Sequence, residues 1–344
     1  MESAIPKLLQ CPRARARRVP DDYTPPYPAW CARHRQSVKQ VVMAYFGVQS
    51  KGPDPQGFLS WIADEFRREG GPGHWDRARY SDEAGYDTVI SIAYWDDPRT
   101  FDAWMDRPGF REWWESDARP SESLGYFREI IRPRIERFET LFSTPDKPEG
   151  VAVLAGAMSG ELQEHAYWGG ARDRIPLSQT DALEPAGRPM RRLADGRRIV
   201  VQPHGNLCLI RSGQDWTETT GDERRMYLSD MEPVLREGMN YLRDQGLPIG
   251  CYANRYMRIV DEQGRETEKS FGMSYFRGLS ELERWAESHP THVAIFGTFM
   301  RIVQQLNFQL KLRLYHEVTV AAADEQSFEY INCHDQTGML RAAT

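Results

Sequence analysis

The sequence predicts an α+β protein in which two ferredoxin-like repeats form a β-barrel-like core flanked by helices, the architecture of a dimeric α+β barrel. Two observations lead to this prediction. Segments with the two-residue period of strands alternate along the chain with segments that have the 3.6-residue period of helices. A strand–helix unit in the first part of the chain also has an echo in the second part, which indicates an internal repeat.

The first 37 residues predict an extended arm with little regular structure. They contain the run PRARARR and the proline-rich segment DDYTPPYPAW. An arginine cluster of this kind either binds an anionic partner or packs on a protein surface. We favour an arm that packs on its own subunit or on a sister subunit.

The first ferredoxin-like half is expected over residues 38–145. Segments 41–48 and 87–95 are rich in β-branched and aromatic residues, as strands are. Segment 57–68 carries its apolar residues on one helical face, and segment 99–116 is expected to be a second helix, which is rich in aromatic residues. A strand near residues 136–142 is expected to close the unit. This order of β, α, β, α and β follows a ferredoxin-like plan.

The second ferredoxin-like half is expected over residues 146–344, after the linker-like run STPDKPEG. Pro233 is expected to kink a long helical stretch or to mark its true start. The chain then continues through a helix after Thr291 and a strand that contains His316. The other predicted elements are strands over 151–157, 206–212, 252–260 and 269–276, and helices over 222–245 and 279–287.

The internal echo pairs SIAYWDDPRTFDAW with FGMSYFRGLSELERW at a constant offset of 181 residues. Tyr94 then corresponds to Tyr275, and Arg111 falls on His292. Each half therefore has a strand, a helix rich in aromatic residues and a second helical segment.

Composition excludes several classes of function. The 344 residues include 44 Lys and Arg against 50 Asp and Glu, which argues against a nucleic-acid partner. The 10 Trp, 15 Tyr and 14 Phe are enough to line a large apolar pocket. Five scattered cysteines form no CxxC or CxxCH motif, so neither a zinc knuckle nor covalent haem attachment is indicated. No apolar run suits a signal peptide or a membrane span, and we expect a cytoplasmic protein without a membrane partner.

Two histidines stand on apolar faces of consecutive elements. His292 lies on the helical stripe that includes Ile295 and Phe299, and His316 stands where the strand alternation calls for Leu or Val. A buried imidazole without a partner is costly, so each ring needs one. In one interpretation, both are core histidines that hydrogen-bond to a carbonyl. In the other, one imidazole is a metal ligand and the other is a proton donor. Spacing alone favours the first interpretation and does not decide.

Several long motifs resemble one family. They are HAYWGGARDRIPLSQTD, NLCLIRSGQDW, SHPTHVAIFGTF and LRLYHEVTVAAADEQSFEYINCH, followed by TGML. Together they resemble the aldoxime dehydratases, from about Tyr45 to Met339. Members of that family are haem b enzymes that convert an aldoxime into a nitrile and water. The resemblance implies a haem-dependent lyase whose ferrous iron binds the nitrogen of a small-molecule aldoxime.

The resemblance also implies roles for the two histidines. His292 would be the cofactor-binding residue and proximal ligand of the haem iron. His289 is its rival, but it precedes Pro290, where a helix-capping role is expected. His316 would be the distal catalytic residue, because hydroxide is a poor leaving group and needs a general acid. Since Arg111 occupies the echo position of His292, we expect one haem per chain.

Three further catalytic residues follow from the resemblance. Ser212 resembles the serine that binds the oxime hydroxyl, although it also suits the end of a strand before a turn. Arg174 resembles the arginine that tunes the distal histidine, and spacing leaves Arg172 open as the alternative. Glu139 resembles the carboxylate that assists this histidine, because a carboxylate favours the imidazolium. A strand-edge glutamate facing water is the other interpretation. His165 is expected to be structural.

Other functions stay open at this point. They are a different haem reaction, such as peroxidase or chlorite-dismutase-like chemistry, a haem carrier or sensor without turnover, and a metal-free ligand-binding domain. A homodimer is expected by analogy, since ferredoxin-like sheets often pair. Surface positions are expected for His34, His74, His204 and His334.

Overall fold

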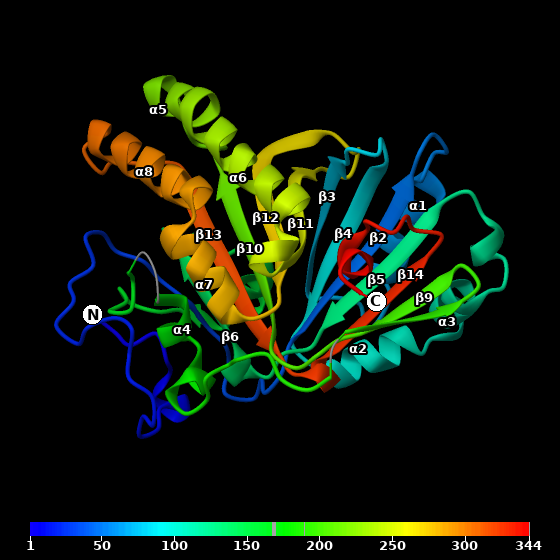
Figure 1. The fold of residues 1–344 in the computed structure, drawn as a ribbon, viewed down its shortest axis with the longest axis horizontal. Coiled ribbons are helices and arrows are strands. Elements are labelled where there is room, and N and C mark those ends of the chain that lie inside the picture. Colours follow the sequence, from blue (N-terminus) through cyan, green and yellow to red (C-terminus); the bar gives the residue numbers. More distant parts are fainter. Residues whose placement is uncertain (167–169, 189, 344) are drawn as a thin grey trace.

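The computed structural model describes residues 1–166, 170–188 and 190–343. Twelve of the strands described form one antiparallel sheet in the order β6-β13-β10-β12-β11-β3-β4-β2-β5-β14-β9-β8. Figure 1 shows this sheet folded into two wings, with helices on its outer faces. Tyr167, Trp168 and Gly169 of the motif HAYWGGARDRIP lie outside the described residues. None of the helices described is long and apolar enough to cross a membrane.

The first repeat has the ferredoxin-like plan. It runs through β2 (Val42–Ser50), α1 (Gln56–Phe66), β3 (His74–Ser81), β4 (Asp87–Trp95), α2 (Pro98–Met105), α3 (Pro108–Glu115) and β5 (Gly125–Ile131). Its strands lie in the order β3-β4-β2-β5. Phe58, Ile62 and Phe66 of α1 pack with Trp104 and Phe110 over one sheet face. This aromatic layer fixes the helices to the outer side of the first wing.

The second repeat has the same plan. Its strands are β10 (Leu207–Asp215), β11 (Cys251–Val260), β12 (Glu266–Phe276) and β13 (Arg313–Ala321), in the order β11-β12-β10-β13. Its helices are α5 (Gly221–Met226), α6 (Glu232–Gln245), α7 (Leu279–Ser288) and α8 (Pro290–Gln305). Leu235, Leu242 and Trp285 bury an apolar face against this sheet. The free ends of α5 and α8 project beyond the sheet in Figure 1.

The two repeats are joined in two ways. β3 pairs with β11, so the sheets run into one another at their edges. In addition, the strand that follows each repeat in the chain pairs with the sheet of the other repeat. β6 (Phe138–Phe142) pairs with β13, and β14 (Gln326–Ile331) pairs with β5. The expectation that segment 136–142 closes the first unit is therefore wrong. This exchange places Glu139 beside the second repeat.

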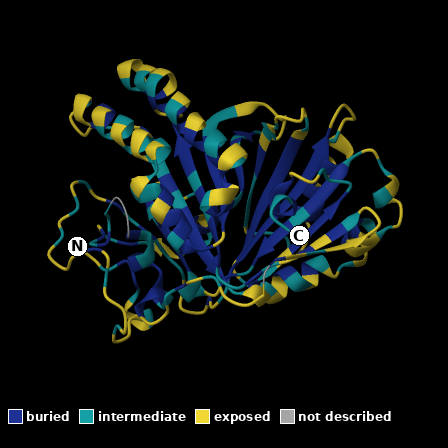
Figure 2. Cartoon of the chain, viewed as in Figure 1, coloured by how far each residue is buried: buried dark blue, intermediate teal, exposed yellow. Residues whose placement is uncertain are grey.

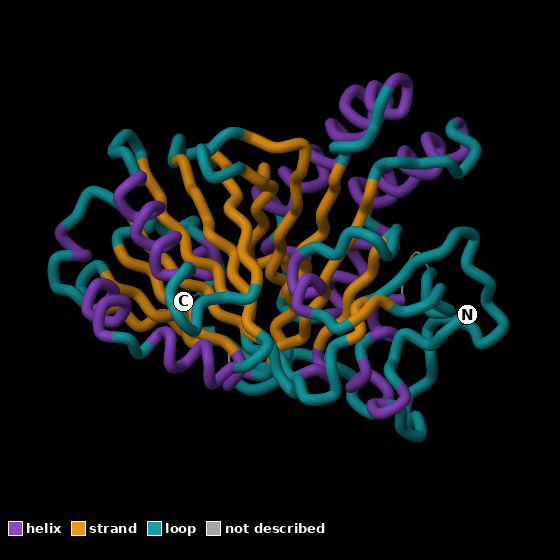
Figure 3. The backbone as a smooth tube through the Cα atoms, turned by 180° about the vertical axis from the view of Figure 1, so that it is seen from behind, coloured by secondary structure: helices purple, strands orange, loops and turns teal. Residues whose placement is uncertain are grey.

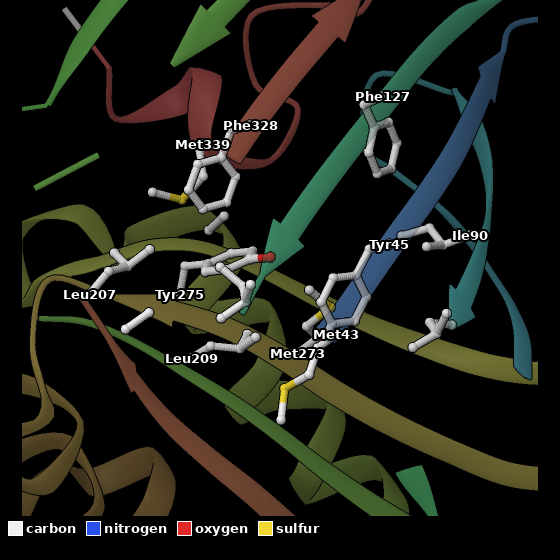
Figure 4. Close-up of a cluster of buried hydrophobic side chains, with 14 of the residues drawn as sticks. Met43, Tyr45, Ile90, Phe127, Leu207, Leu209, Met273, Tyr275, Phe328 and Met339 are labelled. Carbon is white, nitrogen blue, oxygen red and sulfur yellow. The ribbon is translucent and has the colours of Figure 1, made fainter. Parts of the chain in front are cut away.

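The barrel-like core lies between the wings. Figure 4 shows its side chains pointing toward one another from strands of both repeats, including Tyr45 and Phe127 of the first and Met273 and Tyr275 of the second. Figure 2 shows the strands as largely buried, while the outer helix faces are exposed. The predicted fold class is confirmed, with one qualification: the end strands β6 and β8 do not pair with each other among the described strands.

The internal echo corresponds to equivalent elements, since β4, α2 and α3 stand where β12, α7 and α8 stand in the second repeat. The core contains a matching pair of buried carboxylates. Glu129 accepts hydrogen bonds from Arg255 at 2.6 and 2.7 Å, and Glu317 accepts one from the Tyr94 hydroxyl at 2.7 Å. A glycine with positive φ faces each carboxylate, and a Cβ there would approach the carboxylate oxygen to 2.5 Å or less. These glycines are Gly150 and Gly338.

Some predicted elements differ from the structure. The helix expected over 99–116 is two helices, because Pro108 begins a new one. Segment 151–157 is mainly a 3₁₀ turn, Gly150–Leu154, and not a strand. The long helix around Pro233 is interrupted by a π-helical turn, Tyr227–Met231, which accommodates the missing proline N–H. The sequence prediction also missed β3, β5, β14 and the hairpin of β8 (Arg191–Asp195) and β9 (Arg198–Gln202).

The N-terminal arm packs on its own chain. Residues 1–31 contain little regular structure, and Figure 3 shows them as loops at one end of the molecule. β1 (Ala32–Arg33) pairs with β7 (Ala157–Met158). The backbone N–H groups of Arg18 and Val19 donate to the Asp173 carboxylate in α4 (Gly170–Arg174). The division of the chain at residues 37 and 145 stays a prediction.

Candidate active site

A large pocket lies between α6, α7 and α8 on one side and the outer face of β10, β12 and β13 on the other. Its cavity volume is about 380 Å³. Most of the wall is apolar, and polar groups gather at the strand side. Ordinary ligand pockets enclose roughly 300–1,000 Å³. The pocket is therefore of a size that binds small molecules.

His292 occupies the helical wall of the pocket. Its Nδ1 lies 2.8 Å from the carbonyl oxygen of Ala286, and the edge of its ring meets Trp285 at 4.5 Å between centroids. Burial lowers the pKa of this imidazole to about 4. The ring is therefore neutral at pH 7, with the proton on Nδ1 and the lone pair on Nε2. A neutral imidazole oriented by a carbonyl is the usual form of a histidine that binds a metal.

His289 has a different place. It is the N-cap of α8, and its Nδ1 accepts a hydrogen bond from the backbone N–H of Thr291. Its ring packs on Tyr241 at 4.3 Å. His289 therefore has the helix-capping position expected from the proline that follows it.

His316 lies on the strand wall. It is the cross-strand neighbour of Ser212 in the β10–β13 pair, and both side chains line the pocket. His316 Nε2 is 2.9 Å from Oε1 of Glu139 and 3.0 Å from Nη2 of Arg174. The predicted distal residues thus meet at one point of the wall. Nε2 donates to Glu139 when it carries a proton and accepts from Arg174 when it does not.

Glu139 and Arg174 form a buried ion pair behind His316. Arg174 Nε donates to Oε2 of Glu139 at 2.7 Å, and each side chain is only 2% exposed. Burial alone would raise the pKa of the Glu139 carboxyl, but the charges of Arg174 and His316 outweigh it and hold this pKa below its ordinary value. Glu139 is therefore a carboxylate at neutral pH and contacts the histidine rather than bulk solvent.

The position of Arg174 is fixed from the other side. Its Nη1 donates to the carbonyl oxygen of Glu164 at 2.7 Å. A Cβ on Gly170 would approach Nη1 to 2.8 Å, so the glycine leaves room for the guanidinium. Arg172 points elsewhere and binds the carboxylate of Glu283 at 2.7–3.0 Å. Of the two candidate arginines, the geometry brings Arg174 to His316.

The remaining histidines are distributed differently from the prediction. His165 lines the pocket, and its Nδ1 contacts the carbonyl oxygen of Tyr27 at 3.0 Å. Burial and the nearby positive charge of Arg174 lower the pKa of His165 to about 4. The expected surface position is wrong for His204, which is 6% exposed and lies within 3.1 Å of the Tyr252 hydroxyl. His34, His74 and His334 are partly buried.

Two parts of the pocket wall were not predicted from the sequence. Tyr23, Pro26 and Tyr27 of the N-terminal arm line it, and so do Tyr227 and Met231 of the π-helical turn. The proline-rich composition of the arm suggests an extended segment but not the surface that it covers. Pro233 was the signal for the π-helical turn, because a proline inside a helix requires a local change of register.

The residues of the pocket fit a haem. Among the described residues, no group of three or more His, Cys, Asp or Glu could hold a bare metal ion. A single neutral imidazole on an apolar wall instead suits a metal whose other ligands are the nitrogens of a porphyrin. Ile295, Phe299 and Leu235 supply the apolar surface that a porphyrin needs. His292 would hold the iron, with its lone pair on Nε2.

The comparisons with known proteins agree with this geometry. Residues 44–339 match the family of haem-containing dehydratases. An aliphatic aldoxime dehydratase from a Pseudomonas species is 47% identical, with 100% of this chain and 99% of the relative covered. A phenylacetaldoxime dehydratase from Bacillus sp. (strain OxB-1) is 34% identical, with 94% of each chain covered.

Two solved structures have the same fold. The crystal structure of an aldoxime dehydratase is 45% identical, with a TM-score of 0.95 and coverage of 100% of this chain and 99% of that one. A second aldoxime dehydratase, crystallised with butyraldoxime, is also 45% identical with a TM-score of 0.95, covering 100% and 97%. The chain therefore belongs to the haem-containing dehydratase family and is a homologue of the aldoxime dehydratases.

Proposed function

We propose that this protein is a lyase that dehydrates aldoximes to nitriles and water on a haem b held by His292. One observation supports this most directly. Two imidazoles stand on opposite walls of one apolar pocket, one backed by the Ala286 carbonyl and the other by the Glu139–Arg174 pair. A haem bound there in the ferrous state would supply an iron able to bind the aldoxime nitrogen and to donate electron density toward the N–O bond.

His316 is the general acid and then the general base. As the imidazolium it gives a proton to the hydroxyl oxygen of the aldoxime, so that water leaves as the N–O bond breaks. The neutral imidazole then accepts the hydrogen of the aldoxime carbon as a proton, and the C≡N bond forms. One molecule of aldoxime yields one nitrile and one water, and His316 ends in the protonation state in which it began.

Glu139, Arg174 and Ser212 support this histidine. The Glu139 carboxylate, 2.9 Å from Nε2, accepts a hydrogen bond from the protonated imidazole. Arg174 holds Glu139 by two hydrogen bonds, at 2.7 and 3.2 Å, and also lies at 3.0 Å from His316 Nε2. Ser212, opposite His316, orients the hydroxyl of the substrate by a hydrogen bond. The proton transfer then has a fixed direction.

The pocket favours an apolar side chain on the aldoxime. Leu141, Ile210 and Leu314 surround the strand wall near His316. Burying their surface against an alkyl or arylalkyl group contributes about 25 cal/mol for each Å² removed from water. We therefore propose alkyl and arylalkyl aldoximes as substrates.

Assembly and location are also proposed. Ferredoxin-like sheets often pair, which supports a homodimer. All five cysteines are free thiols, which supports a reducing compartment such as the cytoplasm.

The test uses haem-loaded protein reduced with dithionite and a straight-chain aldoxime such as butyraldoxime, with nitrile measured by gas chromatography. We expect nitrile from the wild type, and a loss of roughly 10²–10⁴-fold in His316→Gln with an unchanged haem absorption band. If the reduced wild type forms no nitrile, or if the ferric protein instead turns over peroxide rapidly, the proposal fails.

A further inference from the structure

A second pocket reaches the Glu139–Arg174 pair from behind. It has a cavity volume of about 110 Å³ and lies between the arm, the segment around residues 31–39 and β6. At its outer end it is lined by Leu8, which is 70% exposed, and by Lys39. At its inner end it is lined by Glu139 and Arg174, which are 5% and 3% exposed. The pocket therefore leads from the protein surface to the buried ion pair.

Glu139 connects this second pocket to the main one. Glu139 lines the second pocket, while His316, whose Nε2 is 2.9 Å from Oε1 of Glu139, lines the main pocket. Arg174 lines both pockets. The charged groups that face His316 are thus Glu139 from β6 and Arg174 from α4, and the imidazole of His165 lies near the same arginine. From the solvent inward, the order is therefore the second pocket, then Glu139 and then His316.

The second pocket contains a polar side chain that lacks a partner. Both ring nitrogens of His34 are shielded from solvent, and neither has a hydrogen-bond partner among the described residues. The ring packs edge-on against Phe138 at 5.5 Å. Buried polar atoms in this situation are normally satisfied by ordered water. His34 beside Glu139 and Thr140 gives the pocket enough polar groups to hold water.

We propose that this second pocket is a hydrated path through which Glu139, and through it His316, exchanges protons with solvent while the main pocket is filled. The proposal depends on the role proposed for His316. A proton from a hydronium ion passes through the pocket water to Glu139 and then to Nε2 of His316. The imidazole then releases its other proton from Nδ1 toward the main pocket, and exchange outward follows the same steps in reverse. His34 is a positioning residue that holds the water.

The path has a purpose in the reaction. An apolar pocket filled by cofactor and substrate excludes water, so His316 has no direct access to solvent from that side. A substrate that binds when His316 is neutral then needs one proton before its hydroxyl can leave. The second pocket supplies it without opening the first.

Two variants of one residue test the path. His34→Phe keeps the ring against Phe138 and removes both nitrogens, whereas His34→Gln keeps hydrogen-bonding atoms. The probe is the ferrous carbon monoxide complex of the haem-loaded protein, because the C–O stretching frequency depends on hydrogen-bond donors beside the ligand. After a pH jump, we measure the rate at which the C–O stretching frequency changes. We expect this rate to be roughly tenfold lower in His34→Phe than in the wild type, and to stay within about twofold of the wild-type rate in His34→Gln.

Two further measurements separate the possible failures. His316→Gln must abolish the pH-dependent change of the stretch; if the change persists, the role of His316 is wrong. If His316→Gln abolishes it but His34→Phe and wild type respond at equal rates, the path is wrong and the proposed reaction stands. A high-resolution crystal structure of the wild type gives an independent answer that requires no variant. Ordered water within hydrogen-bond distance of His34 supports the path, and a dry pocket overturns it.

Discussion

Ser212 and His316 are direct cross-strand partners in the antiparallel pair of β10 and β13, and both side chains face the same pocket. Opposite residues of this kind have Cβ atoms about 4.5–5.5 Å apart. A hydroxyl bound between them is within reach of both side chains. Backbone pairing, rather than a flexible loop, therefore sets the distance between the two groups proposed to act on the leaving hydroxyl.

Replacing Ser212 tests this relationship. In Ser212→Ala we expect the kcat for nitrile formation to fall by roughly 10²-fold, because one positioned hydrogen bond to the reacting group is lost. The haem absorption spectrum should not change, since the residue lies on the strand wall. Ser60→Ala, an exposed serine on α1, is the matched control and should keep wild-type kcat. An unaltered kcat in Ser212→Ala would assign the serine to structure alone.

The two arginines of α4 provide a second test. Lysine cannot reproduce the planar fork that Arg174 presents to Glu139, the Glu164 carbonyl and His316. We expect Arg174→Lys to lower kcat by roughly 10²-fold and to shift the pH profile of kcat. Arg172→Lys keeps a charge beside Glu283 and should stay within about threefold of wild type. Equal losses in both variants would contradict the assignment of Arg174.

The barrel interior makes a prediction about stability. Glu129 is fully buried, and its carboxylate holds Arg255 together with the hydroxyls of Tyr275 and Tyr330. Removing one partner leaves a buried charge uncompensated, so Glu129→Gln should lower the free energy of unfolding by about 3–5 kcal/mol in urea titration. Glu266→Gln changes an exposed glutamate and should have an effect near zero. A small effect at Glu129 would mean that water screens the pair.

The pH dependence of stability in acid provides a test of His165. Burial and Arg174 lower its pKa to about 4 in the folded protein, against 6.5 in the unfolded chain. Between these values the unfolded state binds more protons, so this stability is complete above pH 6.5 and is lost as pH falls toward 4. The loss is about 3 kcal/mol for one histidine. Urea titrations of the haem-free protein should therefore show that, between pH 6.5 and 4, the free energy of unfolding of His165→Gln falls by about 3 kcal/mol less than that of the wild type. If His165→Gln and the wild type show the same pH dependence, the prediction is wrong, because folding then does not lower the pKa of His165.

Periodicity predicted much of the fold and the faces of the two histidines. The alternation around His316 and the stripe around His292 put both rings on buried faces, and the structure places both on the walls of one pocket. The echo at an offset of 181 residues found equivalent elements of the two repeats. These signals succeed because each face of a strand or helix must match its local environment.

Long-range pairing could not be predicted in the same way. β3 carries charged residues at Asp76, Arg77 and Arg79, so its composition resembles a loop, yet it joins the two repeats. The exchange of β6 and β14 depends on which sheet edge is open, and no local pattern encodes that. Arg172 and Arg174 stand only two residues apart, and the carbonyl of Glu164 that orients Arg174 belongs to another segment. The catalytic roles of these residues stay predictions.

The absorption spectrum of His292→Ala tests the central claim, that this imidazole on the helical wall holds the haem iron. Protein purified from haem-supplied cells should lose its Soret band or show an altered five-coordinate spectrum, and added imidazole should restore the wild-type form. His289→Ala, which removes the cap of α8 and the ring contact with Tyr241, should keep the wild-type spectrum. A wild-type spectrum in His292→Ala without imidazole would contradict the account, because another residue would then bind the iron.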